Sequence, residues 1–165
     1  ICSLFQNSCL RLYQSNDPVG ASIAGAVKNI IAIGAGMIEG LNLGDNAKAA
    51  LITRGISETS RLIKKSGGNY NTAFGLAGIG DMSLTCSGPH SRNMAYGINL
   101  VKGNNATNTL DLVEGVNAIG AAIALAEKLK IELPIVNAIN QILNEKGNIK
   151  EIISQLLSRP IKDEF

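Results

Sequence analysis

The sequence predicts an all-α fold in which several helices pack around a buried core. Apolar residues recur at helical spacing over long segments, and residues typical of helix ends flank these segments. The chain of 165 residues is long enough for one or two domains with a core. Its 18 glycines and its low charged fraction of 17% favour helices in close contact. The same values exclude a disordered chain, a collagen and a coiled coil.

The N-terminal part of the chain contains one predicted strand and one long predicted helix. Residues 10–14 alternate between apolar and polar side chains, which is typical of a short strand. Asp17 and Pro18 then form a helix start, with the aspartate as the cap and the proline at the first helical position. The helix that follows is apolar and is expected to run to about Gly40.

The middle of the chain is predicted to hold a second helix, a short turn and a loop. Asp45 is expected to cap the second helix, which has apolar residues at helical spacing over 47–66. Residues 71–76 suit a short helical turn. Residues 77–90 hold three glycines and a proline, and this composition predicts a loop.

The C-terminal part is predicted to be helical again. Ser91 can cap a short helix through about Leu100, and a polar stretch follows it. Further helices are expected over 114–129, over 134–145 and over 149–158.

Charge and cysteine content exclude several classes of function. The net charge is +2 and no Lys/Arg-rich run is present, so we expect no nucleic-acid partner. Cys2, Cys9 and Cys86 form an odd set beside a single histidine, which predicts neither a metal site nor a disulfide framework. Reduced thiols fit a cytoplasmic protein. No signal peptide is visible, and the first residue is not Met, so we expect a fragment or a processed chain.

One segment is long enough to be considered as a membrane span. Residues 19–38 number 20, about the length that crosses a bilayer, and Lys28 is their only charged residue. That charge lies at the centre, where it would cost roughly 2.5–3.5 kcal/mol on insertion. We therefore expect a buried helix of the domain and no membrane span.

Two glycine-rich stretches imitate a nucleotide-binding turn without matching it. The dinucleotide fingerprint is G-x-G-x-x-G, and after Gly34 and Gly36 its third glycine should stand at position 39. Position 39 is Glu39, and the order of the spacings over 75–80 is also wrong. The sequence therefore predicts no Rossmann turn and no phosphate-binding loop within this chain.

Lys28 is the residue that carries most information about chemistry. The positions that share its helical face are nearly all small: Ala21, Ala24, Gly25, Ala32, Ala35 and Gly36, with Ile31 as the bulky exception. A partly desolvated lysine with space beside it can bind a ligand and transfer a proton. The alternative is close helix packing with Lys28 in a structural ion pair, and the sequence leaves both open.

Two further groups of polar residues are candidates for a binding site. Asp81 lies in an apolar, glycine-rich segment, where a carboxylate needs a specific partner unless it serves as a cap. Ser91, Arg92 and Asn93 stand at a predicted helix N-terminus, which can bind phosphate or can be an ordinary capped helix start. His90 has no visible partner for a catalytic base, and we expect it to be a loop residue.

A series of motifs, in this order and at these intervals, resembles one known family over essentially the whole chain. The motifs are Gly25-Ala-Val-Lys28-Asn29-Ile-Ile-Ala-Ile, Gly44-Asp45-Asn46-Ala-Lys-Ala-Ala-Leu-Ile-Thr-Arg-Gly55, Gly75-Leu-Ala-Gly-Ile-Gly-Asp81, Leu84-Thr-Cys86, Ser91-Arg92-Asn93 and Val113-Glu114-Gly115. Together they strongly resemble the C-terminal half of the bacterial NAD(P)-dependent glycerol-3-phosphate dehydrogenases. The resemblance implies a multi-helical substrate-binding domain of the 6-phosphogluconate-dehydrogenase-like C-terminal type over 16–165. It also implies that residues 1–15, with their strand, are the remnant of a missing N-terminal Rossmann domain.

The resemblance implies an activity and a role for each matching residue. Enzymes of the family interconvert sn-glycerol 3-phosphate and dihydroxyacetone phosphate with NAD or NADP and without a metal. They supply the glycerophosphate backbone for glycerophospholipid synthesis. By this resemblance Lys28 is the proton acceptor and a substrate contact. The other implied substrate-binding residues are Asn29, Asp81, Thr85, Ser91, Arg92 and Asn93. The residues implied to contact the cofactor are Arg92, Leu112 and Glu114.

The chain also departs from the family pattern. Ala21 and Ser22 stand where the family usually has a Val-Glu pair. The Rossmann half, which binds most of the cofactor, is missing, so we expect this fragment to be inactive alone. The low charge leads us to expect that this half, and a second subunit of a homodimer, cover part of the surface. Two alternatives stay open: the helical domain of a related β-hydroxyacid dehydrogenase, and a non-catalytic helical dimerisation module.

Overall fold

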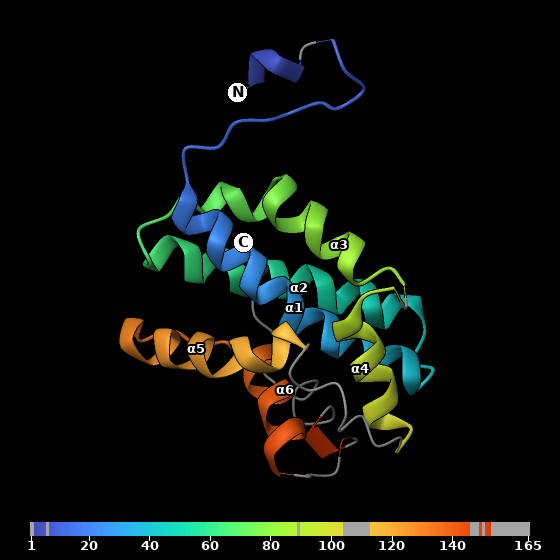
Figure 1. Cartoon of the computed structure of the whole chain (residues 1–165). Coiled ribbons are helices and arrows are strands. Elements are labelled where there is room, and N and C mark those ends of the chain that lie inside the picture. The colour runs from blue at the N-terminus through green and yellow to red at the C-terminus, as the bar shows by residue number, and fades with distance from the viewer. Residues whose placement is uncertain are drawn as a thin grey trace.

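The computed structural model describes residues 2–5, 7–88, 90–103, 113–145, 149, 151 and 152. The elements are, in order, η1 (Cys2–Phe5), α1 (Pro18–Gly40), α2 (Asp45–Lys65), η2 (Tyr70–Phe74), η3 (Leu76–Gly80), α3 (Asp81–Thr85), α4 (Arg92–Val101), α5 (Glu114–Leu129) and α6 (Pro134–Glu145). The described residues form no strand, which confirms the predicted all-α fold. Figure 1 shows α1 inside a bundle formed with α2, α4, α5 and α6.

The start of α1 is fixed by the predicted Asp17 cap. One carboxylate oxygen of Asp17 accepts a hydrogen bond from the Gly20 N–H at 2.9 Å, with Pro18 at the first helical position. Its other oxygen accepts from the Thr72 hydroxyl at 2.6 Å and from the Asn69 N–H at 2.9 Å. The Thr72 hydrogen bond, followed by the one from Gly20, lowers the pKa of Asp17 below its usual value. Asp17 therefore caps α1 and also ties η2 to its first turn.

Helix α1 is the core element of the domain. It is long and apolar enough to cross a membrane by length and composition, and it lies near the N-terminus. In its most apolar window, however, 56% of the residues are buried inside the domain itself. Ile30, Ile31 and Ile33 are fully buried, and α2, α4 and α5 all pack against this helix. These are the contacts that a core helix makes.

Glycines allow α1 and α4 to approach until their backbones touch. A Cβ atom on Gly36 would lie 2.0 Å from the carbonyl oxygen of Met94 in α4. In the reciprocal contact, a Cβ atom on Gly97 would lie 2.1 Å from the carbonyl oxygen of Ile33 in α1. No side chain larger than hydrogen fits at either position, because real Cβ atoms do not come within 3.0 Å of other atoms. Much of the small-residue face of α1 therefore serves helix packing.

Residues 2–5 and 7–16 belong to an arm that extends away from the helical bundle (Figure 1). The strand predicted over 10–14 is wrong, because residues 10–15 have no regular structure and are exposed. A strand needs a neighbouring strand to pair its backbone groups, and the described part of the chain supplies none. The arm carries the exposed Cys9 and the half-buried Cys2, whereas Cys86 lies in the core. Burial raises the pKa of the Cys86 thiol to about 12.

Two predictions for the middle of the chain are corrected by the structure. Asp45 is the first residue of α2 and makes no cap hydrogen bond; the cap position is Gly44, at φ 85°. The predicted loop over 77–90 contains a π-helical turn, η3, followed by the short helix α3. The glycines of this segment predicted a loop. A Cβ atom added to Gly78 would lie only 2.1 Å from the Ala73 carbonyl oxygen, so glycine permits a tight helical turn there.

Other predicted boundaries are confirmed. Helix α4 follows a Ser91 cap, whose hydroxyl accepts from the Met94 N–H at 3.3 Å. Helices α5 and α6 have the bounds predicted from the sequence, and η2 forms the predicted short turn. Residues 149, 151 and 152 are helical, and the rest of the helix predicted over 149–158 lies outside the described residues.

The start of α6 is capped by Glu58 of α2, a residue far away in the sequence. The Glu58 side chain is 3% exposed, and its carboxyl oxygens accept from the Ile135 N–H at 2.8 Å and the Val136 N–H at 3.4 Å. Burial raises the pKa of Glu58 to about 7, despite these hydrogen bonds and the positive charges of Arg61 and Arg54. This contact fastens α6 to α2.

We predict that Gly36→Ala destabilises the domain by about 1–3 kcal/mol, because the added methyl group overpacks the contact with α4. Urea unfolding measures the change in the free energy of unfolding. Gly120→Ala in α5 is the matched control, since a Cβ atom there meets nothing within 4 Å. The control should leave stability unchanged or raise it by up to about 1 kcal/mol. Equal effects of the two substitutions would contradict the close α1–α4 contact.

We predict that Glu58 makes stability fall as the pH rises. Its folded pKa of about 7 exceeds the usual 4.5, so the folded state retains a proton that the unfolded state releases. The stabilisation is complete below pH 4.5 and is lost as the pH rises through about 7, by up to roughly 3 kcal/mol. Glu58→Gln should flatten this part of a stability profile measured by urea unfolding. The exposed Glu127→Gln should not, and a Glu58→Gln profile identical to wild type would contradict the assignment.

Candidate active site

Lys28 and Asp81 form an ion pair at one edge of α1. The Lys28 ammonium donates to one carboxylate oxygen of Asp81, which is the first residue of α3. Their side chains are 22% and 38% exposed, so solvent and small molecules can reach the pair. The expectation that Asp81 has a specific partner is thereby confirmed, and the partner is the lysine that the sequence singled out.

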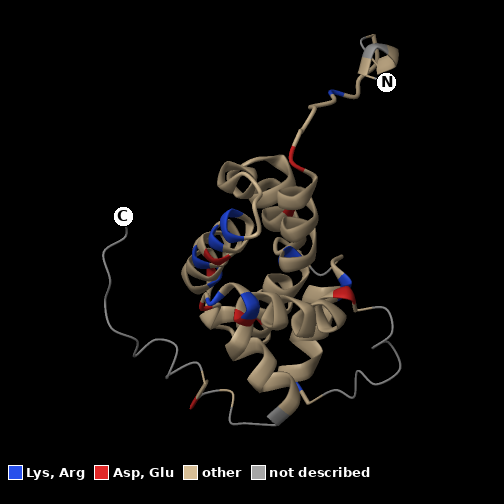
Figure 2. Cartoon of the chain, turned by 90° about the vertical axis from the view of Figure 1, so that its left-hand side faces the viewer, with Lys and Arg blue, Asp and Glu red and all other residues tan. Residues whose placement is uncertain are grey.

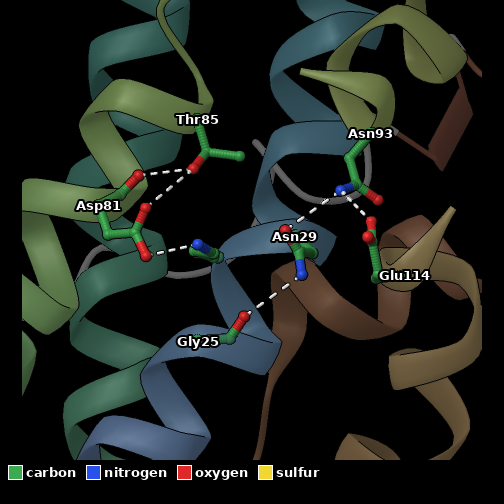
Figure 3. Close-up of polar contacts among 7 residues, drawn as sticks. Gly25, Asn29, Asp81, Thr85, Asn93 and Glu114 are labelled. Atoms are coloured by element: carbon green, nitrogen blue, oxygen red, sulfur yellow. Dashed lines mark hydrogen bonds and ion pairs between the residues drawn. The ribbon is translucent and has the colours of Figure 1, made fainter.

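Thr85 lies one helical turn after Asp81 and contacts it directly. Its hydroxyl donates to the Asp81 carbonyl oxygen at 2.6 Å and lies 3.5 Å from the free oxygen of the Asp81 carboxylate (Figure 3). The short helix α3 therefore presents a hydroxyl and a carboxylate on the same side, next to the Lys28 ammonium.

Asn29 and Asn93 link α1 to α4 on the other side of the site. The Asn93 amide donates to the Asn29 side-chain oxygen at 3.1 Å and to one Glu114 oxygen at 3.3 Å (Figure 3). Its own oxygen accepts from the Gly115 N–H at 2.8 Å. Asn93 is only 3% exposed, so these bonds satisfy a buried amide that joins three helices. Asn29 in turn donates to the Gly25 carbonyl oxygen at 3.3 Å, which fixes its orientation.

Glu114 and Arg92 form a second ion pair at the rim of the site. Arg92 is the first residue of α4 and Glu114 the first residue of α5, and their side chains are 58% and 50% exposed. A hydrogen bond from its own backbone N–H, followed by the Asn93 hydrogen bond, lowers the pKa of Glu114 below its usual value. Glu114 therefore stays ionised and holds the guanidinium at the rim.

A pocket of about 560 Å³ lies between Thr85 of α3 and the Asn29, Asn93 and Glu114 side chains. Its lining residues are Asn29, Leu84, Thr85, Ser87, Gly88, His90, Ser91, Arg92, Asn93 and Glu114. Lys28 and Asp81 are not among them, but Lys28 precedes Asn29 in α1 and Asp81 contacts Thr85. The ion pair therefore borders the pocket, and the volume suits a small polar molecule.

The structure brings most of the predicted site residues together. The residues that line the pocket or pair beside it are Lys28, Asn29, Asp81, Thr85, Ser91, Arg92, Asn93 and Glu114. Leu112 lies outside the described residues. The predicted space beside Lys28 is smaller than the run of small residues suggested, because Ala24, Ala32 and Ala35 are fully buried. Gly25 on that face is open, since a Cβ atom added to it would have nothing within 4 Å, and Ala21 is half-buried.

His90 is a pocket residue that the sequence analysis did not select. It is exposed and lines the pocket beside Ser91 and Arg92. The signal was its position immediately before the Ser91 cap, since a residue there must lie near the free end of the helix. Among the described residues, no three His, Cys, Asp or Glu side chains gather as they would around a metal ion.

Comparison with known families identifies the class of this domain. The family described as the NAD-dependent glycerol-3-phosphate dehydrogenase C-terminus matches residues 17–154. This match covers most of the chain and includes every described residue of the site, and the chain belongs to that family.

Individual relatives agree with this assignment. The chain is 47% identical to the glycerol-3-phosphate dehydrogenase [NAD(P)+] of Bacillus thuringiensis (strain Al Hakam), over 98% of its own length and 48% of that protein. Among solved structures, the glycerol-3-phosphate dehydrogenase of Coxiella burnetii has a TM-score of 0.87 and 38% identity, over 96% of this chain and 50% of the other. The glycerol-3-phosphate dehydrogenase of Saccharomyces cerevisiae has a TM-score of 0.81 and 26% identity, over 94% of this chain and 47% of the other. The chain spans about half the length of the curated relatives it matches.

We predict that Asn93→Ala destabilises the domain by about 2–3 kcal/mol, because the buried Gly115 N–H and the Asn29 oxygen lose their partner. The measurement is again the free energy of unfolding in urea. Asn117→Ala, at an exposed position of α5, is the control and should change stability by less than about 0.5 kcal/mol. If Asn93→Ala were as mild as Asn117→Ala, the three-helix junction would have no energetic role.

Proposed function

We propose that this chain is the substrate-binding part of a glycerol-3-phosphate dehydrogenase, which interconverts sn-glycerol 3-phosphate and dihydroxyacetone phosphate with NAD or NADP. The observation that carries the proposal is the Lys28–Asp81 ion pair beside a pocket of about 560 Å³ whose lining residues are mainly polar. Membership of the family supports it. The product would be the glycerophosphate backbone used in phospholipid synthesis.

Lys28 is the proton-transfer group in this proposal. The nicotinamide cofactor, when bound, supplies or takes up the electron pair at C2 of the substrate. The Lys28 ammonium gives a proton to the C2 oxygen during reduction and takes it back during oxidation. Asp81 holds the ammonium in position, and Thr85 lies beside Asp81 with its hydroxyl at the edge of the pocket. A positive charge at this point also stabilises negative charge that develops on the C2 oxygen.

The rest of the pocket binds the substrate in this proposal. Asn29 and Thr85 line it near the ion pair, and Ser91 and Arg92 line it at the start of α4, where free backbone N–H groups attract phosphate. All three hydrogen bonds of the buried Asn93 amide are to the protein. We therefore propose that Asn93, which lines the pocket, holds Asn29 and Glu114 in place in addition to its implied contact with the substrate.

Arg92, Glu114 and Leu112 are proposed to contact the cofactor. Arg92 and Glu114 fit this role because each is about half exposed at the rim of the pocket. Most of the cofactor would be held by an N-terminal Rossmann domain. Apolar side chains exposed near the site support such a partner: Phe74, Leu76, Ile79 and Leu84 are 39–76% exposed. The arm adds Leu4, Leu10, Leu12 and Tyr13, and we propose that residues 1–15 belong to that domain.

We further propose a cytoplasmic homodimer with α1 as a core helix. Burial of α1 among α2, α4 and α5, and the Lys28 ion pair at its middle, support a core position. The three thiols are free, which fits a reducing compartment. Of the alternative functions, a β-hydroxyacid dehydrogenase domain is disfavoured by the family match. A non-catalytic dimerisation module is disfavoured by the exposed ion pair at the pocket.

We predict that Lys28→Met in the full-length enzyme lowers kcat for dihydroxyacetone phosphate reduction by at least about 100-fold, because proton transfer and charge stabilisation are both lost. Absorbance of NADH or NADPH follows the reaction. Lys65→Met, at the exposed end of α2, is the control and should retain full turnover. Residues 1–165 alone should show no turnover.

Three results would contradict the proposal in different ways. Full turnover by Lys28→Met with disturbed assembly would favour the dimerisation module. Reduction of a β-ketoacid in preference to dihydroxyacetone phosphate would favour the related dehydrogenase. Turnover by residues 1–165 alone would show that no nucleotide-binding half is needed.

A further inference from the structure

The segment of residues 69–85 carries one half of the Lys28–Asp81 ion pair. It contains η2, η3 and α3, and all three pack along α1. Asp81 is the first residue of α3, at the far end of the segment, whereas Lys28 belongs to α1 itself. The approach of the carboxylate to the ammonium therefore depends on where this segment lies along α1.

Asp17 fastens the beginning of the segment to the beginning of α1. One of its oxygens accepts from the Thr72 hydroxyl at 2.6 Å and from the Asn69 N–H at 2.9 Å. The other oxygen accepts from the Gly20 N–H at 2.9 Å. Two glycines leave room for the carboxylate, because a Cβ atom on Gly20 would lie 2.0 Å from one oxygen and a Cβ atom on Gly68 3.1 Å from the other. The carboxylate thus fits between the helix start and the turn that leads into η2.

Asp17 and Lys28 lie on the same side of α1. They are 11 positions apart in the sequence, and 11 steps of 100° come within about 20° of three full turns. At 1.5 Å per residue, the two positions are roughly 16 Å apart along the helix axis. The segment 69–85 is therefore joined to one side of α1 at two points, by Asp17 near its start and by Lys28 near its end.

Backbone hydrogen bonds connect these two points through the segment itself. The Gly75 N–H donates to the Thr72 carbonyl oxygen at 3.3 Å, and the Gly80 N–H donates to the Gly75 carbonyl oxygen at 3.2 Å. Asp81 follows Gly80 directly. Ala73 is fully buried, so the segment is also packed onto the core. A shift of Thr72 along α1 would therefore move Asp81 as well.

We propose that Asp17 is a positioning residue for the reaction, which fixes the segment 69–85 along α1 so that the Asp81 carboxylate meets the Lys28 ammonium. This inference rests on the proposed function. Asp17 contacts neither substrate nor cofactor in this proposal, and it acts through Asp81. Releasing the segment moves Asp81, and with it the ammonium, out of the geometry that proton transfer requires. Displacements of about 1 Å at a catalytic group are enough to lower a rate strongly.

The test separates the two tasks of Asp17 in the full-length enzyme. Asp17→Asn keeps an oxygen for the cap of α1, since asparagine caps helices as well as aspartate does. It places an amide NH₂ where the second carboxylate oxygen accepted two hydrogen bonds. Thr72→Val removes the hydroxyl from this contact, and Thr72→Ser keeps it. Thr59→Val is the matched control, because the buried Thr59 hydroxyl donates to a carbonyl oxygen of its own helix, α2, at 2.8 Å.

We expect Asp17→Asn to lower kcat for dihydroxyacetone phosphate reduction by about 10-fold and Thr72→Val by about 3-fold, with KM for NADH or NADPH within about 2-fold of wild type. Thr72→Ser and Thr59→Val should keep kcat within about 2-fold of wild type. In an Asp81→Ala background, Asp17→Asn should lower kcat by no more than about 2-fold, because the group that Asp17 positions is gone.

Wild-type kcat in Asp17→Asn would overturn the inference. So would an Asp17→Asn loss that is equally large with and without the Asp81 side chain, since Asp17 would then act independently of the ion pair. A raised KM for the cofactor with kcat unchanged would overturn it by placing the effect at the nucleotide-binding half, and an equal loss in Thr59→Val by making stability the cause. Wild-type enzyme that does not reduce dihydroxyacetone phosphate at all would instead refute the proposed function.

Discussion

The contact between α1 and α4 determines where every other part of the site can lie. The two helices run in the same direction and touch at Gly36 and Gly97, where no Cβ atom fits. One to two turns earlier in each helix, this approach brings Asn29 and Asn93 within hydrogen-bond distance. A wider spacing of the helices would separate these amides and would also release Gly115, and with it the first turn of α5. Backbone packing deep in the core thus sets the geometry at the surface.

Consecutive residues on a helix point about 100° apart. Helix α1 therefore lies between two sets of polar side chains, one contacted by Lys28 and the other by Asn29. Lys28 points to Asp81 in α3, whereas Asn29 points to Asn93 in α4 (Figure 3). Among the described residues, Lys and Arg lie interspersed with Asp and Glu over the bundle (Figure 2). The charged side chains described at the site occur in pairs of opposite sign, Lys28 with Asp81 and Arg92 with Glu114.

Several features that depend on neighbours in the sequence could be predicted, although the Asp45 cap was wrong, whereas features that depend on distant contacts could not. The Asp17 cap and the ends of α5 and α6 follow from local capping chemistry, and they were confirmed. The family resemblance named the candidate site residues, and those that the structure describes either line one pocket or pair beside it. The strand over 10–14 was wrong because pairing requires a partner strand. Glu58 and His90 were missed because their roles arise from α6 and from the pocket wall, which the local pattern does not reveal.

The distribution of the three cysteines has a practical consequence. Cys86 is fully buried, and its pKa of about 12 keeps the thiol protonated, so it cannot react with alkylating probes in the folded domain. Cys9 is exposed and Cys2 half-buried, and both lie in the arm outside the helical bundle. A fluorophore attached through a maleimide would therefore label the arm and leave the bundle untouched. Its emission would report when the arm's surroundings change, without any cysteine having to be engineered in or removed.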